Sequence, residues 1–197
     1  MDKTPNPQGK GLVPVLETLA ASRAAIAVPP KRIDQIASEL FTSLFVLESD
    51  FKFRPVVGRS YWLYRKGERF WLSMLAPHEW SAAAHGQVIG ECTLQDDITW
   101  TLTLDAAAAQ DTALLQRIEA RKLAFERRLE AAETIDEALP VFDESLPFFQ
   151  RVCASALAAS LRVSMQKSGI EGLSYDEARG LLAAPEAGSG GGSEQGD

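Results

Sequence analysis

The chain has 197 residues, of which 46% are hydrophobic, and it carries a formal net charge of −7. This length and composition fit one globular domain with long appendages. An acidic chain is a poor general binder of nucleic acid, because attraction to phosphates needs a basic surface, and we therefore expect no DNA partner.

The sequence predicts neither a membrane span nor export. The longest nearly apolar run, residues 152–161, is about half of the roughly 20 residues that a bilayer-spanning helix needs. Prolines stand near the N-terminus where a secretory signal would carry its apolar stretch. We expect a cytoplasmic protein without a membrane partner. Its two cysteines, Cys92 and Cys153, lie apart in apolar surroundings and are expected to be buried free thiols.

The two ends of the chain have compositions typical of disorder. Residues 1–11 are predicted to form a flexible arm and residues 185–197 a disordered tail. Between them, a short helix is expected over residues 15–23. After two prolines, apolar residues repeat at helical spacing and predict an amphipathic helix over residues 31–49. The apolar face of that helix is broad, which implies contact with more than one neighbour.

The periodicity changes to that of strands between residues 51 and 104. Residues 60–65 and 70–75 flank a Lys-Gly-Glu turn whose Gly67 can take positive φ, and they are predicted to form a hairpin. Residues 88–94 and 98–104 predict a second hairpin with one solvated face. Within it, Gly90 indicates a bulge or a close backbone approach.

After residue 105 the pattern is helical. Two motifs match the capping box that begins a helix, one from Thr134 to Glu137 and one from Ser174 to Glu177. The second is expected to begin a final helix over residues 174–182.

The predicted fold class is α+β, with a small antiparallel sheet of two hairpins, about four strands, packed against an N-terminal amphipathic helix and followed by a C-terminal helical region. Residues 12–104 would form the helix and sheet core, and residues 105–184 the helical region packed on it.

The first hairpin concentrates aromatic and basic side chains. Residues 61–80 include three tryptophans, two tyrosines and three basic residues, and between residues 52 and 69 six basic side chains stand against one acid. Exposed rings beside cations would stack on a ligand and bind its anionic groups. Alternatively, the rings form the sheet core and the cations are solvated or paired. The candidate ligand-binding residues are Arg59, Tyr61, Tyr64, Arg65, Lys66, Arg69, Glu79 and Trp80.

No catalytic or metal signature accompanies the hairpin. His78, Glu79 and His85 are the best material for a metal site or for acid–base chemistry, but their spacing is poor and no further ligand lies nearby. The chain lacks a Gly-x-Ser-x-Gly elbow and a phosphate-binding loop of the Gly-x-x-x-x-Gly-Lys type. We therefore predict no catalytic residues, no metal and no cofactor.

One combination of residues between 30 and 104 resembles the domain of unknown function 2452 family, which occurs in bacteria and in some eukaryotes. In place of the glycine that the family carries after its Glu-Trp pair, this chain has Ser81. The family has no established activity, so the resemblance carries over no catalytic residues. The residues that carry it are Gly58, Tyr61, Leu63, Tyr64, Gly67, Phe70, Ser73, Pro77, Glu79, Trp80, Gly90, Leu94, Gln95, Asp97 and Trp100.

The resemblance also implies a structural role for the segment after the first hairpin. Pro77, Glu79 and Trp80 would form a helical turn in which Trp80 anchors against the sheet. Glu79 would then reach an arginine such as Arg54 or Arg59.

The leading functional hypothesis is a cytoplasmic, non-enzymatic module that binds a protein or an anionic partner, RNA and nucleotides included. The broad apolar helix faces also allow a homo-oligomer. The alternative is a small-molecule enzyme with a pocket between sheet and helices, using Glu79 and His78 or His85. A purely structural subunit is the third hypothesis.

Overall fold

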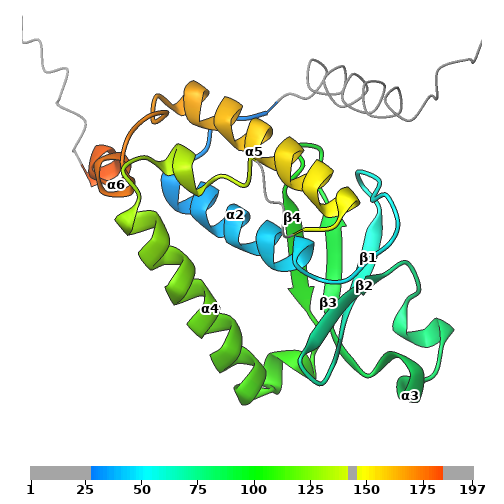
Figure 1. Cartoon of the computed structure of the whole chain (residues 1–197). Coiled ribbons are helices and arrows are strands. Elements are labelled where there is room, and N and C mark those ends of the chain that lie inside the picture. Colours follow the sequence, from blue (N-terminus) through cyan, green and yellow to red (C-terminus); the bar gives the residue numbers. More distant parts are fainter. Residues whose placement is uncertain (1–27, 142–145, 184–197) are drawn as a thin grey trace, which may run out of the picture.

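Figure 1 shows the computed structural model, which describes residues 28–141 and 146–183. The arm over residues 1–11, the helix over residues 15–23 and the tail over residues 185–197 were expected in parts of the chain that lie outside the described residues. The described residues form an α+β fold, as predicted: one four-stranded antiparallel sheet, a helix packed on it and further helices after it.

The predicted amphipathic helix is α2 (Ile33–Leu47). Residues at helical spacing along it are buried, because they form the stripe that faces the sheet. The broad face does contact two neighbours, as expected. The ring of Phe41 lies 5.8 Å from that of Phe125 in a later helix, and the ring of Phe45 lies 5.3 Å from that of Phe70 in the sheet.

Both predicted hairpins are present in the sheet. The first joins β1 (Ser60–Lys66) to β2 (Arg69–Ser73), and Gly67 takes the positive φ, 62°, that its turn requires. The second joins β3 (Gln87–Leu94) to β4 (Trp100–Leu104). The strand order is β2-β1-β3-β4, with every pairing antiparallel. The connection from β2 to β3 must therefore pass β1.

Gly90 was expected to indicate either a bulge or a close backbone approach, and both are present. The pairing of β1 with β3 shifts register next to it, between Leu63 and Tyr64, which is a bulge. A Cβ atom on Gly90 would lie 2.2 Å from the carbonyl oxygen of Thr103. The backbones of β3 and β4 therefore approach too closely for any other residue at this position.

Both edges of the sheet are partly covered by the chain itself. On the β4 edge, the backbone N–H of Trp100 donates to Oγ of Ser43 in α2 at 2.9 Å. On the β2 edge, Asp50 N–H donates to Phe70 O at 2.9 Å, and Leu72 N–H donates to Asp50 O at 3.0 Å. Asp50 is thereby fixed beside β2, a placement that matters for the site described below.

Three longer helices follow the sheet: α4 (Thr112–Ala131), α5 (Phe148–Ser168) and α6 (Tyr175–Ala183). Figure 1 shows α5 lying along α2 and α4 diverging from the sheet. Within residues 28–141 and 146–183, none of the helices has the length and apolar character to cross a bilayer. The remaining short elements are η2 (Pro77–Glu79), α3 (Ala82–His85), η3 (Ala108–Gln110) and η4 (Ile135–Ala138).

One of the two predicted capping boxes is formed. At the start of α6, Glu177 accepts from the backbone N–H of Ser174 at 2.8 Å, and the Ser174 hydroxyl accepts from the Glu177 N–H at 3.3 Å. The motif from Thr134 to Glu137 begins only η4, and the Thr134 side chain makes no cap. Pro140 explains the difference, because it disfavours helical geometry in the residue before it.

Both cysteines are free thiols, as predicted, but only Cys92 is buried as expected. Cys92 is buried, and burial raises its pKa to about 12. Cys153 is half-buried, and burial raises its pKa to about 11. Neither thiol is activated as a nucleophile.

A row of serines on α5 ties separate parts of the fold to that helix. Ser160, Ser164 and Ser168 recur every four residues and so share one face of α5. Their hydroxyls donate to the backbone carbonyl oxygens of Asp97 (2.5 Å), Pro29 (2.7 Å) and Lys31 (2.8 Å). The turn between β3 and β4 and the segment that enters α2 are therefore both anchored on α5.

A buried ammonium group completes this anchorage. Lys31 is 6% exposed, and its Nζ donates to the carboxylates of Glu39 in α2 and Asp97 in the turn. Burial alone would lower the pKa of Lys31, but the hydrogen bonds to the two acids raise it above its ordinary value. Burial alone would raise the pKa of Asp97, but hydrogen bonds from Lys31 and Thr99 lower it.

Replacing Asp97 by asparagine should lower the free energy of unfolding by about 3 kcal/mol at neutral pH, because removing one partner leaves the buried ammonium undercompensated. The folded-state pKa of Asp97 lies below its ordinary value of 3.8, so its stabilisation is present above that value and is lost as the pH falls through the folded-state pKa. Urea unfolding at several pH values should therefore show that the free energies of unfolding of Asp97→Asn and wild type become more similar below about pH 4.

The exposed neighbour Asp96 provides the control, since Asp96→Asn removes the same charge with no buried partner. The role given to this network would be contradicted if Asp97→Asn had the same free energy of unfolding as wild type at neutral pH. It would also be contradicted if Asp97→Asn and Asp96→Asn lowered that free energy equally.

Candidate functional site

The inner face of the first hairpin is core. Tyr61 and Leu63 are 1% and 0% exposed. The Tyr61 ring stacks on that of Phe53 at 5.2 Å and meets that of Trp100 edge-on at 5.7 Å. Its hydroxyl accepts from the Val56 N–H at 2.8 Å. Tyr61 is therefore occupied on every side and offers no open ring to a ligand.

Tyr64, on the outer face, is also fully buried. The rings of Trp71, Trp80 and His85 lie 6.0, 5.4 and 5.0 Å from it. Its hydroxyl donates to Leu75 O at 2.8 Å and accepts from Trp80 Nε1 at 3.2 Å. Burial raises the pKa of Tyr64, which keeps the hydroxyl protonated as a donor.

The segment that covers Tyr64 is the connection from β2 to β3, which contains η2 and α3. Its helical turn at Pro77–Glu79 is as expected, and Trp80 does anchor on the sheet through Tyr64. The expected contact of Glu79 with Arg54 or Arg59 is wrong. The Glu79 carboxylate accepts from the backbone N–H of Ala76 and so closes its own turn. A partner three residues away competes successfully with a more distant arginine.

The tryptophans answer whether the hairpin is core or surface. Trp100 is buried, whereas Trp62, Trp71 and Trp80 are all half-buried. Side chains on the inner face therefore form the core, whereas on the outer face three indole rings are partly exposed to solvent. This arrangement does not form an open stacking platform of tyrosines.

The basic residues of the hairpin are dispersed. Arg65 lies 3.7 Å from a carboxylate oxygen of Asp111, and Arg69 lies 2.6 Å from one of Asp50. Arg59 and Lys66 are exposed and make no ion pair within the described residues. Of the eight predicted site residues, the structure brings together Tyr64, Glu79 and Trp80 as a structural cluster, and only Arg69 lines a cavity considered below.

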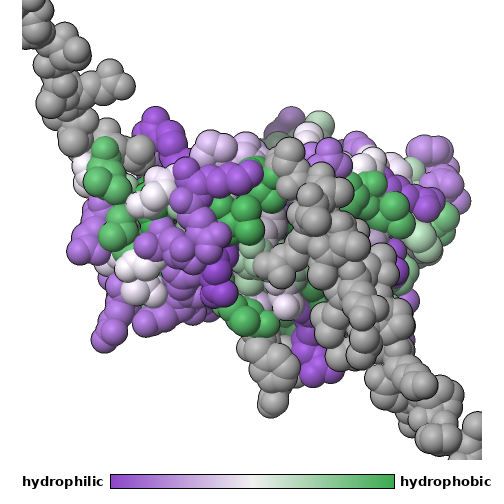
Figure 2. All heavy atoms as spheres, turned by 90° about the horizontal axis from the view of Figure 1, so that it is seen from above, coloured by the Kyte–Doolittle hydropathy of each residue, from purple (hydrophilic) through white to green (hydrophobic). Residues whose placement is uncertain are grey.

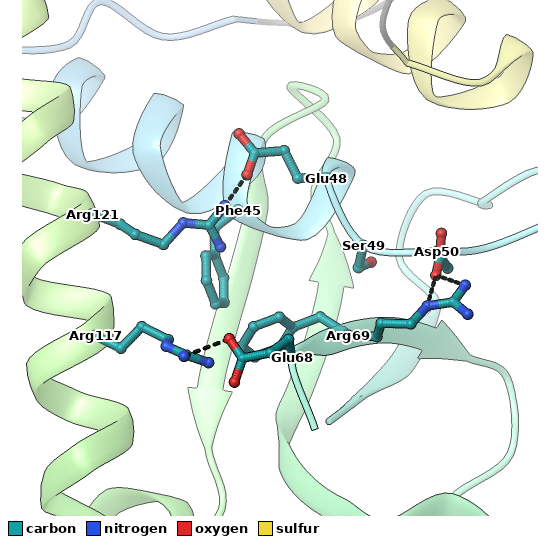
Figure 3. Close-up of a pocket in the computed structure, with 9 residues that line it drawn as sticks. Phe45, Glu48, Ser49, Asp50, Glu68, Arg69, Arg117 and Arg121 are labelled. Atoms are coloured by element: carbon teal, nitrogen blue, oxygen red, sulfur yellow. Dashed lines mark hydrogen bonds and ion pairs between the residues drawn. The ribbon is translucent and has the colours of Figure 1, made fainter. Parts of the chain in front are cut away.

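That cavity is a cleft of about 490 Å³ where α4 diverges from the sheet (Figure 3). It opens between the end of α2, the turn and second strand of the first hairpin, and α4. The rings of Phe45 and Phe70, whose centres are 5.3 Å apart, both line it, and we call them its floor. Its lining residues are Phe45, Glu48, Ser49, Asp50, Glu68, Arg69, Phe70, Arg117 and Arg121.

Three arginine–carboxylate pairs surround the floor. Arg117 donates to Glu68 at 2.5 Å, and Arg121 donates to Glu48. The third pair is that of Arg69 with Asp50, already described. The Arg121 guanidinium also lies 5.3 Å from the centre of the Phe45 ring, within cation–π range. The two pairs made by α4 connect it to the hairpin turn and to the end of α2.

A second hollow, of about 230 Å³, continues the cleft along the seam between α2 and α4. It shares Phe45, Glu48 and Arg121 with the first and adds the ring of Phe125, over which Arg128 lies at 5.7 Å. We call the two hollows together the arginine groove. It contains four arginines, Arg69, Arg117, Arg121 and Arg128, and three carboxylates, those of Glu48, Asp50 and Glu68.

The residues considered for catalysis do not line this groove. His78 is exposed, whereas His85 is buried and its Nδ1 lies 2.8 Å from Gly86 O. Glu79 is held in its own turn. In the part of the chain that the structure describes, no three His, Cys, Asp or Glu side chains gather to hold a metal ion.

Sequence reasoning missed most of the groove. Arg117, Arg121 and Arg128 recur at intervals of four and seven residues and therefore share one face of α4, a signal that the sequence did contain. Glu48 and Phe45 gave no such signal, since Arg121, which contacts both of them, lies more than 70 residues away in the chain.

Comparison with known families adds one finding. Residues 37–119 match the family described as Protein of unknown function (DUF2452). The resemblance noted in the sequence is thereby confirmed. This DUF2452 segment runs from α2 through the sheet into α4, and it contains every lining residue of the 490 Å³ cleft except Arg121. No curated protein and no solved structure matches the chain at a significant level.

The anchoring role of Trp80 is testable. Trp80→Ala should lower the free energy of unfolding by about 3 kcal/mol, through lost burial and the missing donor to Tyr64. Trp80→Phe should cost less, since a ring remains. Urea unfolding measures both, and His78→Ala in the same turn should stay within about 0.5 kcal/mol of wild type. Equal stability of Trp80→Ala and His78→Ala would show that Trp80 is no anchor.

Proposed function

We propose that this protein is a cytoplasmic, non-enzymatic interaction module, and that it binds an acidic segment of a partner protein in the arginine groove. The observation that carries the proposal is the row of Arg117, Arg121 and Arg128 on α4, which faces a floor of phenylalanine rings. The same groove includes Arg69, one of the residues selected from the sequence.

The arginines are available to a partner because their present ion pairs are exposed. The side chains of Glu68, Asp50 and Glu48 are 80%, 59% and 48% exposed. Exposed ion pairs of this kind contribute about 0 to 1 kcal/mol each. A carboxylate from a partner protein can therefore replace one of these acids at little cost, and it gains a guanidinium that is already positioned.

The floor of the groove supplies apolar contact. Phe45 and Phe70 meet edge to face; Phe70 is half-buried, whereas Phe45 and Phe125 are only 5% and 6% exposed, so Phe70 supplies most of the open apolar surface. Arginine and aromatic residues are the groups most often found at the energetic centres of protein interfaces. A partner segment with an apolar side chain between its acids would use both components.

The same geometry favours a protein over RNA or a nucleotide. Three carboxylates line the groove and would repel a chain of phosphates, and the whole molecule is negative. Tyr61 and Tyr64, the rings first considered for stacking on a base, are buried. A protein segment with one or two acids among apolar residues meets less of this repulsion than a chain of phosphates does, and it needs no stacking platform.

Fluorescence anisotropy with a library of labelled peptides of about 20 residues tests the proposal. Peptides that combine acids with aromatic or leucine residues should bind, whereas their basic counterparts should not. Arg121→Glu should weaken binding at least about tenfold, since a charge-assisted hydrogen bond contributes on the order of 1.5 kcal/mol or more.

Arg127→Glu is the matched control, because Arg127 is exposed on the same helix, does not line the groove and undergoes the same change of charge. Equal binding by the two variants would place the site elsewhere. Single-stranded RNA that binds more tightly than every acidic peptide would overturn the assignment of a protein partner.

A further inference from the structure

Taking the proposed function as its basis, we infer that the partner segment is a helix with two carboxylates one turn apart. These carboxylates take the places of Glu68 and Glu48 on Arg117 and Arg121. The acids that now occupy the groove are therefore stand-ins for those of the partner.

The spacing of the two arginines sets the spacing of the ligand's acids. Arg117 and Arg121 are four residues apart, so they lie about 6 Å apart along the axis of α4 and on the same face. A helix that carries acids at positions i and i+4 repeats the same interval of about 6 Å. Laid along α4, it presents one carboxylate to each guanidinium.

The present partners of these arginines come from two unrelated segments. Glu68 lies in the turn between β1 and β2, and Glu48 is the residue at which α2 ends. Each pairs with its arginine through one Nη2 atom, as Figure 3 shows. A guanidinium has five N–H donors, so each arginine keeps donors for an incoming carboxylate.

Glu68 is the more easily displaced of the two. Its side chain is 80% exposed, and its only hydrogen bond within the described residues is the one from Arg117. Glu48 is less exposed and also ends α2, where its backbone N–H donates to Leu44 O. The partner's carboxylate therefore competes first with Glu68 for Arg117.

The Phe45–Phe70 floor selects an apolar side chain on the same helix. Residues three or four apart share a helix face, so an apolar residue at i+3 or i+7 would point into the cleft between and beyond the two acids. The cleft of about 490 Å³ has room for such a side chain. The walls of the groove include two helices, α2 and α4. We therefore infer that the partner binds as a helix that lies in the groove.

Three peptides of equal length and charge distinguish this geometry. The first carries glutamates at i and i+4 with a leucine at i+3, the second moves one glutamate to i+5, and the third places a proline between the glutamates. The first should bind about tenfold more tightly than either of the others. Glu68→Gln should improve its affinity by about threefold, since it removes a competing exposed ion pair.

Glu91→Gln is the matched control, because Glu91 is exposed on β3 and does not line the groove. Equal binding of the three peptides, or preference for an extended peptide with acids at i and i+2, would overturn the helical geometry. Unchanged affinity in Glu68→Gln would overturn the stand-in role. In either case acidic peptides would still lose binding with Arg121→Glu, so the proposed function would stand; if no acidic peptide binds at all, both fall.

Discussion

The buried ammonium of Lys31 fixes the frame on which the rest of the structure depends. Removing a cation from water costs several kcal/mol unless acids compensate for it, and here the acids come from two different elements. Glu39 belongs to α2, and Asp97 belongs to the turn between β3 and β4. The backbone of Lys31 is held by Ser168 of α5 as well. These requirements are met together only when α2 lies in one position against both the sheet and α5, so the network specifies that position.

The arginine groove follows from where this network ends. α4 is tied to the sheet mainly at its start. There Asp111 caps the helix and accepts from Gln87, and these hydrogen bonds lower its pKa. Beyond that point α4 diverges, and it is connected back by exposed ion pairs and by the contact of Phe41 with Phe125. The buried side chains of Phe125 and Leu129 hold α4 to the core, while the contacts of the seam that face solvent are exchangeable ion pairs, and such a seam is a favourable place for a partner to bind.

Features that depend on local spacing could be predicted from the sequence. The stripe of α2, the alternation of the two hairpins, Gly67 in its turn and the close approach at Gly90 are each encoded within a few residues. The capping motif at Thr134 failed because a motif says how a helix begins and not whether the chain allows it to continue, and Pro140 does not. The position of the β2–β3 connection over Tyr64 could not be predicted from the sequence for another reason. It depends on β1 lying between β2 and β3, and strand order is set by packing across the whole sheet.

The same distinction explains why the candidate site in the structure differs from the one predicted from the sequence. The unusual composition of the aromatic and basic hairpin predicted a ligand-binding site there. Its tyrosines, however, are required for the core and for the anchorage of Trp80. The groove is assembled from Phe45 and Glu48 at the end of α2, Glu68 in the hairpin turn and arginines of α4. No stretch of sequence shows these together. Its floor, its three acids, Arg69 and Arg117 lie in the DUF2452 segment, whereas Arg121 and Arg128 lie beyond it. In the proposed function the DUF2452 segment therefore supplies the apolar surface, the competing acids and two of the four arginines, and the part of α4 beyond it supplies the other two.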